Sequence, residues 1–412
     1  MTKITDIPAI RFKGFSDTWE QRKFSELVQI ERGGSPRPID DFITDAPNGL
    51  NWVKIGDAPT QGNYITKTAE KIRPEGLSKT REVHPGDLIL SNSMSFGKPY
   101  IMGIDGCIHD GWLLIRNTYG VFDLTFLCHL LGTPQMLSQY RSLAAGSTVN
   151  NLNKELVGNT YVTIPSITEQ RVLGAYLEQL DNLITLHQRK YDKLTNVKKS
   201  MLEKMFPQNG SNVPEIRFKG FTEAWEQRKA IDIADYSKGN GYSKGDLTDA
   251  GTPIILYGRL YTKYQFAISE VDTFAVPRNG AVYSQGNEVI VPASGETAED
   301  IARASAVEKS GVLLGGDLNI LRPFDFINPL FLALAISNGE PQKELAKKAQ
   351  GKSVVHIHNT DIQEVTIAYP SRTEQDRIVS VFRQLDNLIT LHQRELEKLK
   401  KLKKACLEKM FV

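Results

Sequence analysis

Hydrophobic residues recur at alternating intervals of three and four positions along two long segments, 166–206 and 371–412. A stripe with this spacing over more than four turns is typical of a coiled-coil seam, and proline interrupts neither segment. We therefore predict two helices of about 39 residues, each roughly 58 Å long at 1.5 Å per residue. The predicted seam residues are Leu177, Leu180, Ile184, His187, Tyr191 and Leu194 in the first helix, and Phe382, Leu385, Ile389, His392, Leu396 and Leu399 in the second.

The rest of the chain has a different pattern, in which short apolar runs alternate with glycine and proline. Residues 87–90, 112–116, 253–257 and 288–291 have the length and composition of short buried strands. We expect a mixed α/β (α+β) fold with two domains rich in irregular β structure, each joined to a long helix.

The chain is one unit repeated in tandem, because several segments return at an offset of 205 or 206 positions. The interiors, 30–60 and 236–266, share little sequence. Shared ends with divergent interiors predict one scaffold that carries two different surfaces, and simple drift after an old duplication is the alternative. The repeated segments are IRFKGF at 10–15 and 216–221, WEQRK at 19–23 and 225–229, LDNLITLHQR at 180–189 and 385–394, and LEKMF at 202–206 and 407–411.

The repeat predicts how the chain is divided. We expect a first domain over 8–165, a helix over 166–206, a linker over 207–213, a second domain over 214–370 and a second helix over 371–412. If the copies form a pseudo-two-fold pair, the helices run antiparallel as a long two-helix coiled coil that separates the domains and acts as a spacer. The alternative is that each helix pairs with another chain.

Composition narrows the class of protein only modestly. The hydrophobic content of 40% allows real cores, and the net charge of +2 does not by itself indicate a nucleic-acid partner. Cys107, Cys128 and Cys406 lie far apart, which argues against a disulfide framework and suits a reducing cytoplasm. Residues 1–10 lack the apolar core of a signal peptide, and the apolar run 330–336 is too short to span a bilayer. We therefore expect a cytoplasmic location without a membrane partner.

Three motifs resemble parts of catalytic centres but are incomplete. Gly351-Lys352-Ser353 resembles a phosphate-binding loop, yet position 346 is alanine where that motif requires glycine. Asn328-Pro329-Leu330-Phe331 lacks the second proline of an amino-methyltransferase motif. Cys128 and His129 have no partners at zinc spacing, so a packed cysteine and histidine are expected there.

The remaining histidines do not complete a site either. His356 and His358 could share one face of a strand, but two ligands do not make a structural zinc site. His187 and His392 fall on the predicted seam, where a polar pair that sets the helix register is the better interpretation. We predict no catalytic residue, no metal site and no cofactor in this chain.

The order of these elements resembles the specificity subunit of a type I restriction–modification system. A divergent domain ends in Ile164-Pro165-Ser166-x-Thr168-Glu169-Gln170, a long helix follows, and the same order returns with Tyr369-Pro370-Ser371-x-Thr373-Glu374-Gln375. Glycine-rich segments at 32–36, 52–57, 83–87 and 315–317 also resemble parts of that family's target-recognition domains.

The resemblance implies a function for each part of the chain. Two target-recognition domains would each recognise one half of a bipartite, asymmetric site in double-stranded DNA, and the chain itself would be non-catalytic. The implied partners are two methyltransferase (modification) subunits and the restriction/translocase subunits. Those partners would supply the chemistry of S-adenosylmethionine, ATP and magnesium.

Candidate DNA contacts are basic and hydroxyl side chains, because such groups bind phosphates and base edges. In the second domain, the run at 257–264 mixes aromatic and basic residues, which suits a nucleic-acid surface. A solvated surface with ordinary charges is the alternative for each residue. The candidates are Arg32, Ser35, Arg37, Lys54, Ser91, Ser93 and Lys98 in the first domain, and Lys238, Tyr242, Lys244, Tyr257, Arg259, Tyr261 and Lys263 in the second.

Two other functions stay open at this point. The chain could be a scaffold that does not bind nucleic acid, in which two ligand-binding domains are attached to a coiled coil. It could also be an enzyme with an unrecognised centre. Salt-dependent, sequence-selective DNA binding together with a methyltransferase partner would distinguish the specificity subunit from the scaffold. Activity of the purified chain alone would favour the enzyme.

Overall fold

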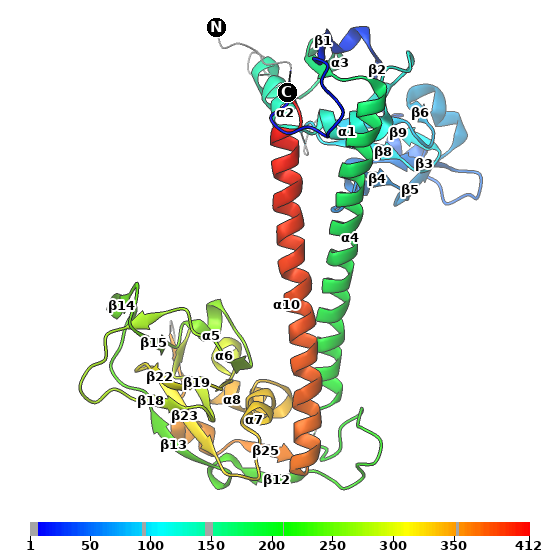
Figure 1. Ribbon diagram of the computed structural model, residues 1–412. Helices are drawn as coiled ribbons and strands as arrows, with labels where there is room; N and C mark the ends of the chain where they lie inside the picture. Colours follow the sequence, from blue (N-terminus) through cyan, green and yellow to red (C-terminus); the bar gives the residue numbers. More distant parts are fainter. Residues whose placement is uncertain (1–6, 93–95, 145–150, 209, 352–353) are drawn as a thin grey trace. The chain divides into compact units, whose positions relative to one another are not determined.

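The computed structural model describes residues 7–92, 96–144, 151–208, 210–351 and 354–412. The chain divides into two compact units, Met1–Lys190 with Leu391–Val412 (unit 1) and Tyr191–Thr390 (unit 2). Two helices of 38 residues, α4 (Ile167–Lys204) and α10 (Arg372–Lys409), each pass from one unit into the other. Each unit therefore contains a mixed α/β domain and one end of both long helices (Figure 1).

The domain of unit 1 is built on two small sheets. Residues that alternate between the two faces of the first sheet belong to different hydrophobic clusters, so this sheet is buried on both sides. The first sheet has the order β2 (Gln29–Arg32), β10 (Trp112–Arg116), β7 (Leu88–Ser91), β8 (Pro99–Met102) and β4 (Tyr64–Ile65), and the second has the order β5 (Glu70–Ile72), β3 (Leu50–Val53), β9 (Gly106–Ile108) and β6 (Arg81–Val83).

The domain of unit 2 repeats this topology, with one strand added at the edge of its second sheet, even though the two interiors share little sequence. Its first sheet has the order β13 (Ala234–Lys238), β23 (Leu318–Pro323), β19 (Glu288–Pro292), β21 (Ser305–Val307) and β16 (Ala267–Ile268). The second sheet has the order β14 (Leu247–Thr248), β17 (Phe274–Ala275), β15 (Thr252–Ile255), β22 (Ser310–Leu314) and β18 (Tyr283–Gln285), and a small ribbon joins β20 (Ser294–Gly295) to β24 (Val355–His356). The divergent interiors are thus one scaffold with different side chains.

Three short helices and one strand follow the sheets in each unit, and the strand pairs with the repeated EQRK segment. In unit 1, β11 pairs antiparallel with β1 (Glu20–Lys23), and in unit 2, β25 pairs in the same way with β12 (Glu226–Lys229). These elements are α1 (Leu124–Leu131), α2 (Pro134–Ala144), α3 (Lys154–Gly158) and β11 (Tyr161–Ile164) in unit 1, and α7 (Pro329–Ile336), α8 (Gly339–Lys348), α9 (Asn359–Gln363) and β25 (Thr366–Tyr369) in unit 2. Unit 2 also contains the single-turn helices α5 (Arg259–Thr262) and α6 (Ala298–Ile301).

The repeated Glu-Gln pair at the start of each long helix attaches the helix to its own domain. Buried Glu169 accepts two hydrogen bonds from Arg11, at 2.6 and 2.7 Å. Gln170 accepts from the Asp123 amide at 3.0 Å and donates to the Pro165 carbonyl at 3.1 Å. Glu374, Gln375 and Arg217 make the equivalent contacts in unit 2.

The repeated Met-Phe pair completes each hydrophobic core with the end of a long helix. In unit 1, the Phe411 ring stacks on Phe126 with centroids 5.5 Å apart and meets Trp19 edge-on at 6.3 Å. In unit 2, Phe206 stacks on Phe331 at 5.7 Å and meets Trp225 at 6.0 Å. Met410 and Phe411 therefore belong to the core of the first domain, although they follow the second domain in sequence.

The helix segments within each unit run antiparallel. In unit 1, Asp181 of α4 pairs with Lys403 of α10, and His187 lies against His392. Residue numbers therefore increase along α4 in the direction in which they decrease along α10. In unit 2, Lys198 and Asp386 make the equivalent ion pair at 2.5 Å.

The predicted seam residues differ in what they contact. Leu177, Leu180, Phe382 and Leu385 are buried within the domain cores. Ile184 and Leu396 are also buried. The half-buried members of the seam are His187, Tyr191, Leu194, Ile389, His392 and Leu399.

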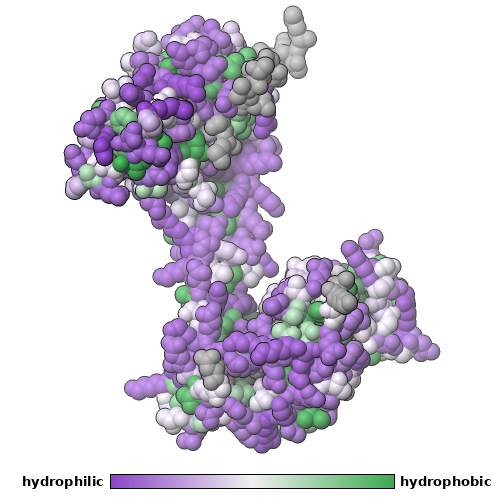
Figure 2. Space-filling model, turned by 180° about the vertical axis from the view of Figure 1, so that it is seen from behind, coloured by the Kyte–Doolittle hydropathy of each residue, from purple (hydrophilic) through white to green (hydrophobic). Residues whose placement is uncertain are grey.

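No helix in the described ranges is long and apolar enough to cross a membrane. The face shown in Figure 2 is predominantly hydrophilic, with hydrophobic residues in small, scattered groups.

Candidate nucleic-acid interface

One end of the strands in unit 1 brings four of the predicted DNA contacts together. Arg32 ends β2, the loop that follows carries Ser35 and Arg37, and Lys54 follows β3. Ser35, Arg37 and Lys54 line an open pocket of about 860 Å³, whose wall also includes His109. Residues from three separate loops thus form one surface.

Two glycines allow the β2 loop to pack against its neighbours. A Cβ atom on Gly33 would lie 2.2 Å from the His109 carbonyl oxygen, and one on Gly34 would lie 2.4 Å from the Lys79 carbonyl oxygen. The Gly33 amide donates to the Trp112 carbonyl at 2.9 Å. This close approach explains the Gly-Gly pair of the sequence and holds Ser35 and Arg37 against the turn at 109–111.

Asp110 lies at the centre of this surface, although it was not among the predicted contacts. Its Oδ1 accepts a hydrogen bond from the Ser35 hydroxyl at 3.0 Å, and Arg37 Nη2 lies 3.8 Å from its Oδ2. Its backbone carbonyl accepts from Arg32 Nε at 3.4 Å and from Asn92 at 2.8 Å. Its place between a histidine and a glycine in a tight turn was the only available signal.

The other candidates of unit 1 fall into different environments. Lys54 is half-exposed and forms an ion pair with Glu70 at 2.5 Å. Lys98 is exposed, and its ammonium lies 4.9 Å from the centre of the Tyr100 ring. Ser91 is fully buried in β7, so it is not a surface contact, contrary to expectation. Ser93 lies outside the described residues.

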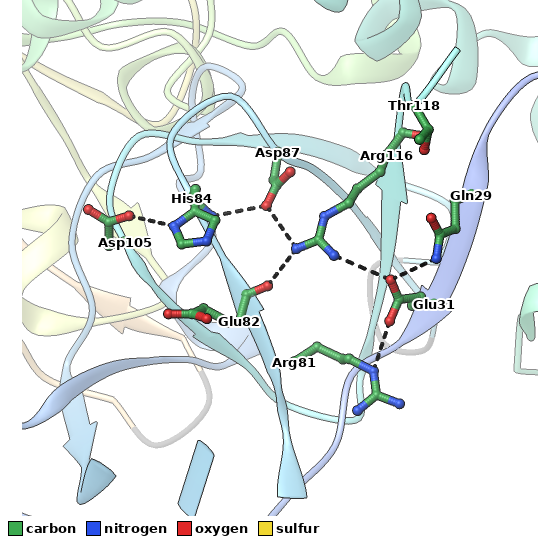
Figure 3. A network of polar contacts seen from close by, with 9 residues as sticks. All are labelled: Gln29, Glu31, Arg81, Glu82, His84, Asp87, Asp105, Arg116 and Thr118. Atoms are coloured by element: carbon green, nitrogen blue, oxygen red, sulfur yellow. Dashed lines mark hydrogen bonds and ion pairs between the residues drawn. The ribbon is translucent and has the colours of Figure 1, made fainter. Parts of the chain in front are cut away.

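The opposite end of the same strands has a different electrostatic character. Arg116, at the end of β10, contacts Glu31 at 3.3 Å, Asp87 at 3.5 Å and the Glu82 carbonyl at 2.9 Å. Figure 3 shows this guanidinium surrounded by acidic partners, with Arg81 on the far side of Glu31. The arginines here are neutralised by carboxylates, so this end is unsuited to phosphate.

A histidine extends this acidic network. His84 Nδ1 lies 2.8 Å from Asp105 Oδ1, as Figure 3 shows. The hydrogen bond to Asp105 raises the pKa of His84 above its usual value, and the nearby Glu82 charge acts in the same direction.

In unit 2, three predicted contacts are exposed at the equivalent end of the strands. Lys238 ends β13, and Lys244 lies in the loop that follows it. Tyr257, beyond β15, is 38% exposed and packs edge-on against Tyr261. These side chains are free to meet a ligand.

Four other candidates in unit 2 have partners inside the protein. Only 8% of the Arg259 side chain is exposed, and it donates to Asp272 at 2.6 Å. Lys263 also pairs with Asp272, at 2.6 Å, and these two hydrogen bonds, that of Lys263 first, hold the pKa of Asp272 well below its usual range.

The two tyrosines complete this group. Tyr242 is buried, and its hydroxyl accepts from the Arg278 amide at 2.9 Å. Tyr261 donates to the Ser294 carbonyl at 2.5 Å, and burial raises its pKa. The aromatic-basic run at 257–264 is thus largely structural, although it was expected to be a DNA surface.

Arg278 is a second residue that the sequence analysis missed. Its guanidinium lies 5.1 Å from the centre of the Tyr242 ring and forms an ion pair with Asp246. The Ser243 amide and then Arg278 lower the pKa of Asp246 to about 2. Arg278 thereby fastens the loop that carries Lys244.

The motifs considered for catalysis have structural roles where the structure describes them. Cys128 and His129 are buried in α1, and burial lowers the pKa of His129 to about 4. His356 belongs to β24, whereas His358 caps α9, so the two do not share a strand as expected. Residues 352 and 353 of the Gly-Lys-Ser motif lie outside the described ranges. Within those ranges, no three His, Cys, Asp or Glu residues are grouped to hold a metal.

Two domains of one topology, joined by two long antiparallel helices, define a class of two-domain proteins with an internal repeat. Comparison with known families finds the same repeat. The sequence model of the family described as "Type I restriction modification DNA specificity domain" matches residues 16–196 and again 222–401. The chain belongs to this family, whose members are the DNA-recognition components of type I restriction–modification complexes and leave catalysis to other subunits.

Individual relatives match along nearly their whole length. The chain is 20% identical to the type I restriction enzyme MjaVIII specificity subunit of Methanocaldococcus jannaschii, over 94% of both chains. It is also 20% identical to the MjaIX specificity subunit of that organism, over 95% of this chain and 92% of the relative. The crystal structure of the S subunit from M. genitalium shares the fold, with a TM-score of 0.60, 15% identity and coverage of 98% and 99%.

Proposed function

We propose that the two domains recognise different halves of a bipartite, asymmetric DNA site. One observation carries this proposal: the domains share a topology, yet the chemistry at equivalent strand ends differs. The turn before β10 is His109-Asp110-Gly111, whereas the turn before β23 is Gly315-Gly316-Asp317. The amides of Gly33 and Gly239 bond to the first residues of these two strands, which supports the equivalence. A common scaffold with different loop chemistry suits two different half-sites.

The paired helices are proposed to set the distance between the half-sites. The Asp181–Lys403 pair of unit 1 recurs as Asp386–Lys198 in unit 2, with both partners displaced by 205 positions. His187 contacts His392, its own equivalent. Contacts that map onto themselves when the copies are exchanged support a pseudo-two-fold relationship. The helices would then act as a ruler.

Partner subunits of the restriction–modification complex are proposed to bind in two equivalent copies. Leu183 and Leu186 of α4 are 43% and 45% exposed, and the equivalent Leu388 and Leu391 of α10 are 43% and 51% exposed. Leucines kept on the outer face of both helices favour two copies of one partner, the methyltransferase subunit. S-adenosylmethionine, ATP and magnesium would bind in the partner subunits, and the complex would work in the cytoplasm.

Methylome sequencing tests this function directly. Cells that contain the chain and its methyltransferase partner should methylate a motif with two specified halves around an unspecified gap. The motif should disappear when the chain is deleted and return when it is restored. A methylome that does not depend on the chain would contradict the proposal and leave the scaffold without DNA binding as the better function.

A further inference from the structure

We propose that Asp110 recognises a base directly in the half-site of the first domain, by accepting a hydrogen bond from an exocyclic amine in the major groove. Cytosine N4 and adenine N6 both present such a donor there. This inference rests on the proposed function, because it assigns a specificity-determining residue to the surface described above.

The two carboxylate oxygens of Asp110 have different surroundings. Oδ1 accepts from the Ser35 hydroxyl at 3.0 Å and lies 3.0 Å from His109 Nε2. Oδ2 has only Arg37 Nη2 near it, at 3.8 Å, which is too long for a hydrogen bond. Among the described residues, Oδ2 therefore has no hydrogen-bond donor, although Asp110 lines the open pocket. One oxygen holds the side chain in place and the other is free to accept.

The proton position on His109 is determined by its neighbours. The Gly111 amide donates to His109 Nδ1 at 2.8 Å, so Nδ1 carries no proton. Nε2 of the neutral ring must then carry the proton, and it lies 3.0 Å from Asp110 Oδ1, so the N–H dipole favours the carboxylate there. The buried Trp52 packs edge-on against the same imidazole, with ring centroids 5.9 Å apart. The carboxylate is thus held in one orientation before DNA arrives, as a base contact requires.

The charges around Asp110 suggest different contacts for the cations and for the carboxylate. Lys54 on this surface already pairs with Glu70, but the Arg37 side chain is 83% exposed and Arg32 also borders the turn. These cations suit phosphates, which attract the protein to any sequence. A carboxylate would be repelled by phosphate, so its place among cations favours contact with a base edge. In unit 2 the equivalent turn is Gly315-Gly316-Asp317, in which Gly316 has the position of Asp110 and the carboxylate follows one residue later, so this contact is specific to the first half-site.

The test uses the full chain in complex with its methyltransferase partner and short duplexes that contain the methylated site. In each duplex, one cytosine or adenine of the first half-site is replaced by an analogue that lacks its N4 or N6 amine. We expect one such replacement to weaken binding of the wild-type complex about tenfold. The replaced base distinguishes cytosine from adenine. If no amine deletion in that half-site weakens binding, the inference is wrong whatever any variant does.

Substitution of Asp110 by asparagine completes the test. D110N replaces the acceptor at Oδ2 by a donor, so the variant should no longer respond to the sensitive amine deletion, while the second half-site is read as before. A matched control is D105N, which makes the same change at the other end of β9, where Asp105 is 77% exposed. It should behave as wild type.

Arg37→Ala provides a contrasting variant. It should weaken binding to every sequence alike and leave the amine response intact. If D110N instead behaves in this way, Asp110 only positions Arg37 and Ser35, and the inference falls. If the wild-type complex shows no sequence selectivity at all, the proposed function fails rather than the assignment of Asp110.

Discussion

The Nδ1 atoms of His187 and His392 lie 3.1 Å apart, although the two residues occupy the same position in the two copies of the sequence. One ring must donate and the other must accept, so the pair cannot be doubly protonated at this contact. Burial, and then the charge of His187, lower the pKa of His392. The pair sets the register of the helices with a polar contact, which specifies one alignment at some cost in stability.

Lengthening both helices at this pair should lengthen the gap in the recognised site. One heptad inserted after His187 and another after His392 keep the helices in register and add roughly 10 Å, or about three base pairs. The methylated motif should therefore gain about three unspecified positions between unchanged halves. Methylome sequencing measures the gap. An active variant with the original gap would refute the ruler function.

A buried histidine should make the first domain sensitive to acid. Burial is the largest cause that lowers the pKa of His129 to about 4, and the Lys403 charge adds to it. The unfolded chain has the usual pKa of about 6.5 and therefore binds the proton more readily as the pH falls. The stabilising contribution is complete above about pH 6.5 and is lost as the pH falls toward 4, which amounts to about 3 kcal/mol.

The second copy suggests the substitution that tests this. Leu334 occupies the equivalent position in α7, so His129→Leu should fit a helix of the same kind. Asp181 would keep Asn63 and Lys403 as partners. Denaturant unfolding at pH 7.5 and 4.5 should show that wild type loses about 2.5 kcal/mol relative to the variant, because pH 4.5 is still slightly above the folded pKa. Equal losses in both proteins would contradict the prediction.

The end of the chain should stabilise the domain at its beginning. Phe411 is buried against Phe126 and Trp19, so Phe411→Ala should cost about 3–5 kcal/mol in unit 1. Hydrogen exchange should accelerate in β10 and stay slow in β23. Phe206→Ala is the matched variant, and it should produce the reverse pattern. Protection of β10 that survives the loss of the Phe411 ring would be inconsistent with its place in this core.

The sequence predicted the features that repeat, because a segment that returns in both copies marks residues that the shared structure requires. The helix starts at Glu169 and Glu374 were visible in this way, although their arginine partners lie 158 and 157 positions away and had no assigned function. The common topology of the interiors was not visible. Strands of two to six residues are specified by burial and pairing, which different side chains satisfy equally well.

The candidate contacts show a second limit of sequence reasoning. Arg37 and Arg259 are the same residue type beside similar glycine-rich segments, but one side chain is 83% exposed and the other 8%. Whether a cation is free depends on a carboxylate outside its own motif, here Asp272 for Arg259. Asp110 was missed for the converse reason, because acidic residues were not considered as DNA contacts.

This difference in exposure leads to opposite expectations for two basic residues of the second domain. Lys244 is exposed at the end of the strands proposed to face DNA, so Lys244→Ala should weaken binding to all sequences and lower the salt dependence of the affinity by about one phosphate contact. Arg259→Ala should leave the salt dependence unchanged. It should instead cost about 2 kcal/mol of stability, because it removes a charged hydrogen bond to Asp272 and two further hydrogen bonds, to Gln265 and the Glu270 carbonyl. Binding of the full complex measured over a range of salt concentrations, together with unfolding of each variant, separates the two effects.

Lys309→Ala, at the opposite end of β22, is the matched control and should change neither the salt dependence nor the stability. A Lys309 variant that alters the salt dependence as strongly as the Lys244 variant would place the DNA at the wrong end of this sheet.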